Sequence, residues 1–322
     1  MKYAITGATG FVGRALARHL HAQGHEVVAV VRSPDRAGEL AEWGVELAAG
    51  DLSDVAAMTA AFRGADGVFH VAGWYKVGVP DPTEAWAVNV EGTRNAIRAA
   101  RAAGVPRVVH TSTCAINSDT DGRTVDEEYR HTGPHLTTYD ETKAQAHDVA
   151  VAAAASHETP EVVIVMPGGI YGPGDTSSVG ELLKEVATGR RTMVSARLRM
   201  VEAHVDDIAA GHLLAMEKGR PGEAYMLAGE RTDLASMAEE MAQITGGRRP
   251  IVMPGPLLPV AEKVFDVAGR VLPLPPQFSG EAMRSARSSY LGTSTKARRE
   301  LGWSYRGMHR GFVDTAEAEG WI

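Results

Sequence analysis

The sequence predicts an α/β protein with a doubly wound parallel sheet and a smaller, discontinuous C-terminal domain. Short, β-branched apolar runs alternate with helix-length segments over about the first 170 residues, as expected for parallel strands covered on both faces. A glycine-rich turn joins the first apolar run to the first helical segment. After about residue 172 the alternation ends, and glycine and proline become more frequent.

Six runs are predicted to be strands because they are short, apolar and rich in β-branched residues: Lys2–Thr6, Glu26–Val31, Val45–Ala48, Gly67–Val71, Arg107–Thr111 and Glu161–Met166. The intervening segments have helical length and composition: Val12–Gln23, Asp54–Phe62, Glu84–Ala103 and Tyr139–Ser156. Glycines stand where three of these helices should end, at Gly24, Gly64 and Gly104.

Two later segments are expected to return to the sheet, a helix at Asp206–Glu217 and a strand at Glu223–Leu227. We therefore expect one domain of residues 1–172 with 204–228, and a second of 173–203 and 229–322. The second contains the amphipathic stretch Leu257–Leu272, which predicts core packing or a pocket wall. A helix lying on a membrane surface is the alternative.

Composition excludes several classes of protein. The 33 Lys and Arg and 40 Asp and Glu give a net charge of -7, which argues against a nucleic-acid binder that relies on bulk positive charge. Cys114 is the single cysteine, so we expect no disulfide, an inert packed thiol, no metal site and a cytoplasmic location. No apolar run reaches the roughly 18 residues needed to span a bilayer, and no leader precedes the first strand.

The turn after the first strand predicts a dinucleotide site, and hence a Rossmann-type sheet. Its glycines, Gly7, Gly10 and Gly13, would allow a tight turn, close approach to a pyrophosphate and close packing of helix on strand. The helix N-terminus would offer free N–H groups to the anion. We expect the whole motif to contact the cofactor: Gly7, Thr9, Gly10, Phe11, Val12 and Gly13.

The end of the second strand predicts which dinucleotide is bound. Arg32 stands where an acidic residue would bind a ribose 2′-hydroxyl, and Arg36 follows closely, so NADP(H) is favoured over NAD(H). The alternative is a solvated arginine beside a turn. Asp51 and Leu52, after the third strand, suit a contact with the adenine edge, although such a carboxylate can also serve only as a helix cap.

Tyr139 and Lys143 stand four residues apart, on one face of a predicted helix. A free tyrosine has a pKa near 10, so it needs a nearby cation to act as an acid or base at neutral pH. Lys143 and an oxidised nicotinamide would supply that positive field. Three hydroxyls at the end of the fifth strand, Thr111, Ser112 and Thr113, lie where ligands bind in such sheets.

Together these motifs resemble the extended short-chain dehydrogenase/reductase family, and the resemblance covers nearly the whole chain. It rests on the glycine turn, the hydroxyl run, the Tyr–Lys pair and five further stretches: Asp51-Leu52, His70–Gly73, Asn89–Thr93, Pro167–Gly174 and His204–Asp207. The late stretch Lys296–Trp303 is also similar to that family.

The resemblance implies roles for particular residues. Thr113 would bind the substrate oxygen, Tyr139 would be the general acid/base and Lys143 its activator. Asn89 would position a helix or relay protons, with a purely structural role as the alternative. Five residues would line the cofactor or flank its nicotinamide: Val71, Ala72, Gly73, Pro167 and Ile170. A homodimer through the helices that contain Asn89 and Tyr139 is also implied.

Within the family the chain looks most like dihydroflavonol reductase-type and hydroxysteroid dehydrogenase-type members. This implies hydride transfer between NADP(H) and a carbonyl or secondary alcohol of a small lipophilic or aromatic substrate. Cys114 and Ala115 follow Thr113, where dehydratases carry carboxylates, which argues against dehydration. Two alternatives stay open: a nucleotide-sugar epimerase with tightly bound NAD, and a nonenzymatic NADP-sensing regulator.

Overall fold

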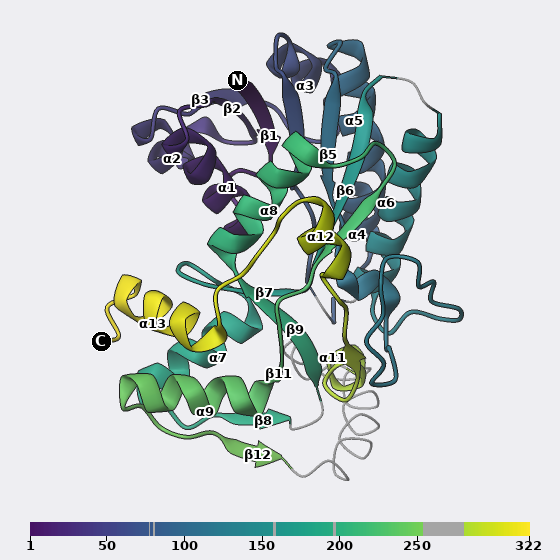
Figure 1. Ribbon diagram of the computed structural model, residues 1–322. Helices are drawn as coiled ribbons and strands as arrows, with labels where there is room; N and C mark the ends of the chain where they lie inside the picture. Colours follow the sequence, from purple (N-terminus) through teal and green to yellow (C-terminus); the bar gives the residue numbers. More distant parts are fainter. Residues whose placement is uncertain (77, 80, 157–158, 196–197, 254–279) are drawn as a thin grey trace.

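The computed structural model describes residues 1–76, 78–79, 81–156, 159–195, 198–253 and 280–322. Within them a seven-stranded, wholly parallel sheet has the order β10-β6-β5-β4-β1-β2-β3 (Figure 1). Its strands are β1 (Lys2–Thr6), β2 (Glu26–Val31), β3 (Glu46–Ala49), β4 (Gly67–His70), β5 (Arg107–Thr111), β6 (Glu161–Pro167) and β10 (Ala224–Leu227). The strand order is that of a Rossmann-type sheet, as the sequence predicts.

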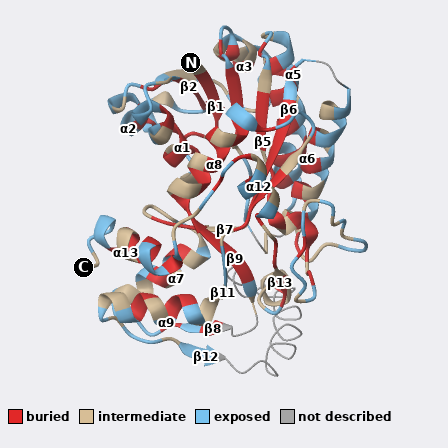
Figure 2. Cartoon of the chain, in the orientation of Figure 1, coloured by how far each residue is buried: buried red, intermediate tan, exposed pale blue. Residues whose placement is uncertain are grey.

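Helices cover both faces of this sheet. Helices α1 (Phe11–Ala22) and α8 (Val205–Lys218) pack on one face, whereas α3 (Val55–Phe62), α5 (Gly92–Ala102) and α6 (Thr138–Ala155) pack on the other. The strands between them are mostly buried (Figure 2), except for the edge strand β3, whose residues are exposed or half-buried. Three short helices lie in the connections: η1 (Pro34–Arg36), α2 (Gly38–Glu42) and η3 (Cys114–Asn117).

Most predicted element boundaries agree with the structure to within one residue, and the helix predicted at Glu84–Ala103 is present but is not a regular α-helix throughout. The chain forms α4 (Thr83–Ala85), a wider π-helical stretch η2 (Trp86–Glu91) and then α5 without interruption. Within this stretch the Asn89 carbonyl accepts a bond from the Thr93 hydroxyl while the Asn89 amide bonds to neighbouring segments. Wide turns of this kind are frequent at functional sites.

The second part of the chain has its own sheets and core. Strands β7 (Gly169–Tyr171), β9 (Arg199–His204), β11 (Glu230–Asp233) and β13 (Ser289–Tyr290) form one sheet, and β8 (Met193–Ser195) pairs with β12 (Ile251–Met253). An apolar core holds together α7 (Ser178–Ala187), α9 (Leu234–Thr245) and α13 (Met308–Ala318). Two further helices are α11 (Gly280–Ser285) and α12 (Thr295–Glu300).

The amphipathic stretch predicted at Leu257–Leu272 lies outside the described residues. In the described part of the chain, no helix combines the length and the apolar composition needed to cross a membrane.

Glu202, in the middle of β9, is a buried acid in the second part of the chain. It is 2% exposed, and its Oε2 has no hydrogen-bond partner among the described residues. Its carboxylate fills the space where Gly169, its partner in register, would carry a side chain. Burial, and then the neighbouring Asp175, raise the pKa of Glu202 to about 8, so its side chain is uncharged at neutral pH.

The raised pKa of Glu202 predicts that the free energy of unfolding falls as pH rises. Between about pH 4.5, its ordinary pKa, and about pH 8, unfolding ionises Glu202 and releases a proton, so stability decreases as pH rises through this window. Glu202→Gln stays uncharged. We expect its thermal midpoint to exceed that of the wild type by a few degrees at about pH 8.5 and by far less at about pH 5. Calorimetry measures both.

The exposed Glu26, on β2, provides the matched control, because Glu26→Gln should give no pH-dependent difference. Parallel stability curves for wild type and Glu202→Gln would contradict the assignment.

Candidate active site

The glycine turn has the close backbone contacts that its sequence predicts. Gly7 has a φ of 80°, and a Cβ there would lie 2.5 Å from the amide nitrogen of Ala72. A Cβ on Gly13 would lie 2.1 Å from the carbonyl oxygen of Gly7. Gly10 is the N-cap of α1 and supplies no side chain to its first turn. The turn therefore leaves a bare helix N-terminus beside the ends of β1 and β4, which is the geometry that suits a diphosphate.

The residues predicted to select the dinucleotide lie at the ends of β2 and β3. Arg32 and Arg36 are both exposed. Asp51 accepts hydrogen bonds from the backbone and the hydroxyl of Ser53, and these bonds, with a smaller contribution from Arg32, lower its pKa. Leu52 packs on α5, where a Cβ on Gly92 would lie 2.6 Å from it. This end of the sheet therefore presents two cations beside one carboxylate.

Thr113 and Tyr139 meet at the other side of the glycine turn, beyond the carboxyl end of β5. The Thr113 hydroxyl lies near enough to the Tyr139 phenol to lower its pKa, and it donates a hydrogen bond of 3.4 Å to the Pro167 carbonyl. Burial raises the pKa of Tyr139 to about 12, while the Thr113 hydroxyl opposes this rise. The phenol is therefore protonated at neutral pH and can donate a proton.

The neighbouring hydroxyls have other partners. Thr111 is bonded to His212 at 2.9 Å, on the α8 side of the sheet. Ser112 is bonded to His147 at 2.9 Å, on the α6 side. Of the three hydroxyls in this run, the one that contacts Tyr139 is thus that of Thr113.

Lys143 lies one helical turn after Tyr139 and is 6% exposed. Its ammonium donates a hydrogen bond of 2.7 Å to the backbone carbonyl of Thr111. A Cβ on Gly73 would lie 3.8 Å from Nζ, so the loop after β4 runs directly over this cation. Burial lowers the pKa of Lys143 to about 8, which still leaves it mostly charged at neutral pH.

Two stacked imidazoles lie beneath Lys143. The rings of His70 and His110 are 5.4 Å apart, and burial, followed by the charge of Lys143, lowers the pKa of both. His70 is held between Thr6 and Thr93, at 2.7 and 3.1 Å. Neither ring nitrogen of His110 has a hydrogen-bond partner in the part of the chain that the structure describes. Both rings are neutral, so Lys143 carries the local charge.

Asn89 joins the loop after β4 to the helix that carries Tyr139. Its Oδ1 accepts a bond of 2.7 Å from the Trp74 N–H, and its Nδ2 donates to the Trp74 carbonyl at 3.0 Å and to the Thr142 hydroxyl at 2.9 Å. The side chain is 1% exposed. This geometry fits the positioning role expected for Asn89.

The remaining predicted cofactor residues line the same edge of the sheet. Val71 and Ala72 lie against Gly7, and Pro167 ends β6 beside Thr113. Ile170, on β7, packs against the core shared by α1 and α8. The structure thus brings all but the outlying Arg32, Arg36, Asp51 and Leu52 to the ends of β1, β4, β5 and β6.

Cys114 and Asp140 flank the Thr113–Tyr139 pair. The Cys114 thiol donates to the Met166 carbonyl at 3.3 Å, and burial raises its pKa to about 12, as expected for an inert thiol. Asp140 is 2% exposed and accepts a bond from the Tyr290 hydroxyl at 3.2 Å. Burial raises the pKa of Asp140 to about 7. The sequence reasoning missed Asp140, although its position beside Tyr139 was a signal.

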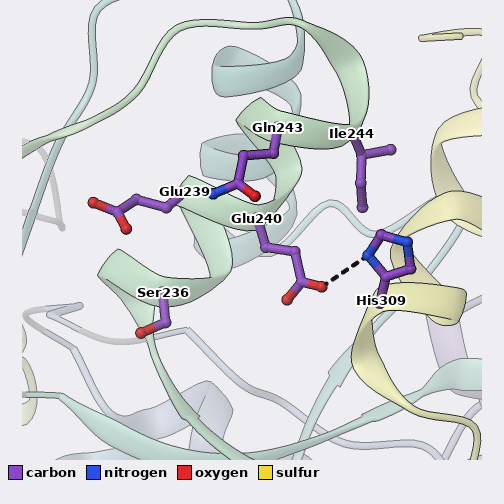
Figure 3. Close-up of a pocket in the computed structure, with 6 residues that line it drawn as sticks. All are labelled: Ser236, Glu239, Glu240, Gln243, Ile244 and His309. Atoms are coloured by element: carbon purple, nitrogen blue, oxygen red, sulfur yellow. Dashed lines mark hydrogen bonds and ion pairs between the residues drawn. The ribbon is translucent and has the colours of Figure 1, made fainter.

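A separate hollow of about 360 Å³ lies between α9 and α13, where Glu240 and His309 are joined by a hydrogen bond of 3.1 Å (Figure 3). It contains none of the predicted site residues. Across the ranges that the structure describes, no group of three or more His, Cys, Asp or Glu side chains is arranged to hold a metal ion.

Comparison with known proteins identifies the family of the chain. The sequence profile of the NAD dependent epimerase/dehydratase family matches residues 3–228. The chain belongs to this family. The extended short-chain dehydrogenase/reductase resemblance predicted from the motifs is thereby confirmed.

Individual members of the NAD dependent epimerase/dehydratase family align over almost the full chain. A putative dihydroflavonol 4-reductase of Synechocystis sp. is 34% identical over 96% of this chain and 92% of its own length. A 4-hydroxy-2-methyl-3-oxo-4-farnesyl-3,4-dihydroquinoline-1-oxide ketoreductase of Stigmatella aurantiaca is 31% identical over 99% and 97%. The crystal structure of gox2253 has 32% identity, covers 99% of both chains and gives a TM-score of 0.84.

The Asn89 bonds predict a large loss of stability on truncation. Asn89→Ala leaves the Trp74 backbone groups buried without their partner, so the free energy of unfolding should fall by about 3 kcal/mol. Asn95→Ala is the matched control, because Asn95 makes a single, partly buried bond to the Leu52 carbonyl and should cost about 1 kcal/mol. Urea denaturation measures the free energy of unfolding of both variants. Equal losses would contradict the role of Asn89 as the link between the loop after β4 and α6.

Proposed function

We propose that the protein is an NADP(H)-dependent oxidoreductase that moves a hydride between nicotinamide and a carbonyl or secondary alcohol. The observation that carries this is the placement of the Thr113 hydroxyl beside the Tyr139 phenol at the carboxyl end of β5, with the Lys143 ammonium one helical turn away. A hydroxyl and a phenol side by side can hold one substrate oxygen between them. The reductase names of both relatives support an oxidoreductase.

The glycine turn fits a dinucleotide. Because a Cβ on Gly7 or Gly13 would collide with neighbouring backbone, the turn stays narrow, and the bare N-terminus of α1 is free to bind a diphosphate. Val71, Ala72, Gly73, Pro167 and Ile170 would line the path from this turn to Tyr139. When bound, the nicotinamide donates or accepts the hydride.

The chain itself supplies the proton. In reduction, Tyr139 Oη donates its proton to the carbonyl oxygen, and the Thr113 hydroxyl donates a hydrogen bond to that oxygen as negative charge develops. The phenol is protonated at neutral pH before substrate binds, because its ordinary pKa is already near 10 and burial raises it further. The Lys143 ammonium then favours the phenolate that remains, because the side chains around it are neutral.

The proton donor is tested by Tyr139→Phe, which removes one oxygen. We expect turnover to fall at least about 100-fold, while the dissociation constant for NADPH changes less than about threefold. Tyr129→Phe, in the loop before α6, is the control and should turn over normally. Nicotinamide absorbance with a panel of carbonyl compounds gives the rates, and normal turnover by Tyr139→Phe would remove the assignment.

The preference for NADP(H) is supported by the exposed Arg32 and Arg36, which can pair with a 2′-phosphate. Asp51 follows β3, where it is expected to contact the adenine edge, and the position that would bind a ribose hydroxyl is occupied by Arg32. The solvated-arginine alternative predicts no discrimination between the two dinucleotides.

Arg32→Ala tests this directly. We expect the KM for NADPH to rise at least about tenfold, with the KM for NADH nearly unchanged, because one charge-assisted contact to the phosphate is lost. Arg63→Ala, an exposed arginine that follows α3, is the control. A wild-type preference for NADH would overturn the assignment of Arg32.

For the substrate, we propose a small lipophilic or aromatic carbonyl compound, which accords with the dihydroflavonol and farnesylated quinoline named for the two relatives. A nucleotide-sugar epimerase is the second candidate, since the family description includes epimerases. Activity without added cofactor, with NAD copurifying, would favour it. The intact Tyr139 and Lys143 argue against a nonenzymatic sensor.

The organisation of the chain belongs to the same proposal. Residues 1–172 and 204–228 would bind the cofactor, and residues 173–203 and 229–322 would bind the substrate. Trp86 and Val151, on the segments that hold Asn89 and Tyr139, are large exposed apolar side chains, which supports a homodimer through these helices. A cytoplasmic location remains an expectation from the cysteine content.

A further inference from the structure

Glu281, from the C-terminal part of the chain, reaches two segments of the candidate site. Its Oε2 accepts a hydrogen bond of 2.5 Å from the N–H of Gly78, in the loop after β4. Its Oε1 accepts a bond from the N–H of Thr138, the first residue of α6. Tyr139 is the next residue. One carboxylate thus joins α11, the loop after β4 and the start of the helix that carries the proton donor.

The position suits a negative charge. Thr138 is at the N-terminus of an 18-residue helix, where unpaired N–H groups and the helix dipole favour an anion. Thr137 already caps this helix through the Asp140 N–H, so Glu281 satisfies a different donor of the same turn. The contact is therefore specific to the first turn of α6 and adds to its ordinary cap.

Glu281 duplicates the link made by Asn89. Asn89 joins the loop after β4 to α6 from inside, through Trp74 and Thr142. Glu281 joins the same loop to the same helix at other points, through Gly78, later in the loop, and Thr138, one turn earlier in the helix. Two links between two segments fix their relative orientation as well as their separation, which a single link does not.

The segment after Glu281 is fastened nearby. The Tyr290 hydroxyl bonds to Asp140, and Ser289 bonds to Asp119 through both its backbone and its hydroxyl. Asp119 lies in the connection that begins at Thr113 and ends at Tyr139. The C-terminal segment therefore holds both ends of the connection between the two hydroxyls of the proposed proton step.

We propose that Glu281 is a positioning residue for hydride transfer, which aligns Tyr139 with the loop after β4 by binding Thr138 and Gly78 at once. This inference rests on the proposed function. Without Glu281, α6 would keep its Thr137 cap and its core packing, but the first turn would be free to move against the loop. Misplacement of a reacting group by about 1 Å can cost about 100-fold in rate.

Glu281→Ala tests the inference through the split between rate and binding. We expect kcat to fall about 10- to 100-fold, with the KM for NADPH within about twofold of wild type. Glu281→Gln, which keeps the size and one acceptor oxygen, should retain an intermediate kcat. The intermediate variant also serves if Glu281→Ala fails to fold.

Glu230→Ala is the matched control. Glu230 likewise accepts a bond from the first residue of a helix, the N–H of Met308 in α13, at 2.8 Å. Glu230→Ala should lower the free energy of unfolding about as much as Glu281→Ala does, and its kcat should stay at the wild-type value. The proposal would be overturned if Glu281→Ala had the kcat of the wild type. It would also be overturned if Glu281→Ala and Glu230→Ala lost kcat to the same extent.

Hydrogen exchange separates this inference from the proposed function. In Glu281→Ala the amides of Gly78 and Thr138 should exchange at least about tenfold faster than in wild type, whether or not a substrate has been found. A wild-type protein without turnover on any carbonyl would count against the proposed function. An active wild type with unchanged exchange in Glu281→Ala would count against the inference alone.

Discussion

The candidate site depends on one buried positive charge. Lys143 is almost fully buried, and its ammonium is held by the carbonyl at the end of β5. Desolvation lowers its pKa but leaves it mostly protonated at neutral pH. A buried charge without a carboxylate partner is costly unless the groups around it are polar and neutral. This requirement explains the composition of the layer between β4, β5 and α6.

The neutral layer consists of histidines and hydroxyls. Burial, and then nearby cations that include Lys143, lower the pKa values of His70, His110 and His147, so the three rings add no charge. His70 and His147 are bonded to hydroxyls, whereas His110 has no partner among the described residues. The chain of bonds from Thr6 through His70 to Thr93 then reaches the Asn89 carbonyl. This chain of bonds thus connects the wide π-helical turn that contains Asn89 to β1, the strand that leads into the glycine turn.

Sequence patterns predicted the sheet and the central chemistry because both depend on local signals. β1, β2 and β5 begin and end at the predicted residues, since each is a β-branched run bounded by a turn. The pattern could not predict the wide π-helical turn within this helix, where Asn89 makes side-chain bonds to Trp74 and Thr142, which are distant in sequence. Glu281 was missed for a similar reason. Its two partners are backbone groups distant in sequence, and the residues next to Glu281 form no motif that indicates them.

The strand order has a consequence for how the chain can be made or cut. β6 is buried in the sheet, yet its outer neighbour β10 is synthesised only after β7, β9 and α8. Until β10 arrives, β6 presents an apolar edge with unpaired backbone groups, the kind of edge on which other chains aggregate. A fragment that ends soon after β6 would keep that edge permanently. The sheet is thus completed by a strand that follows the first segment of the second part of the chain, so a contiguous N-terminal piece that ends before β10 cannot complete it.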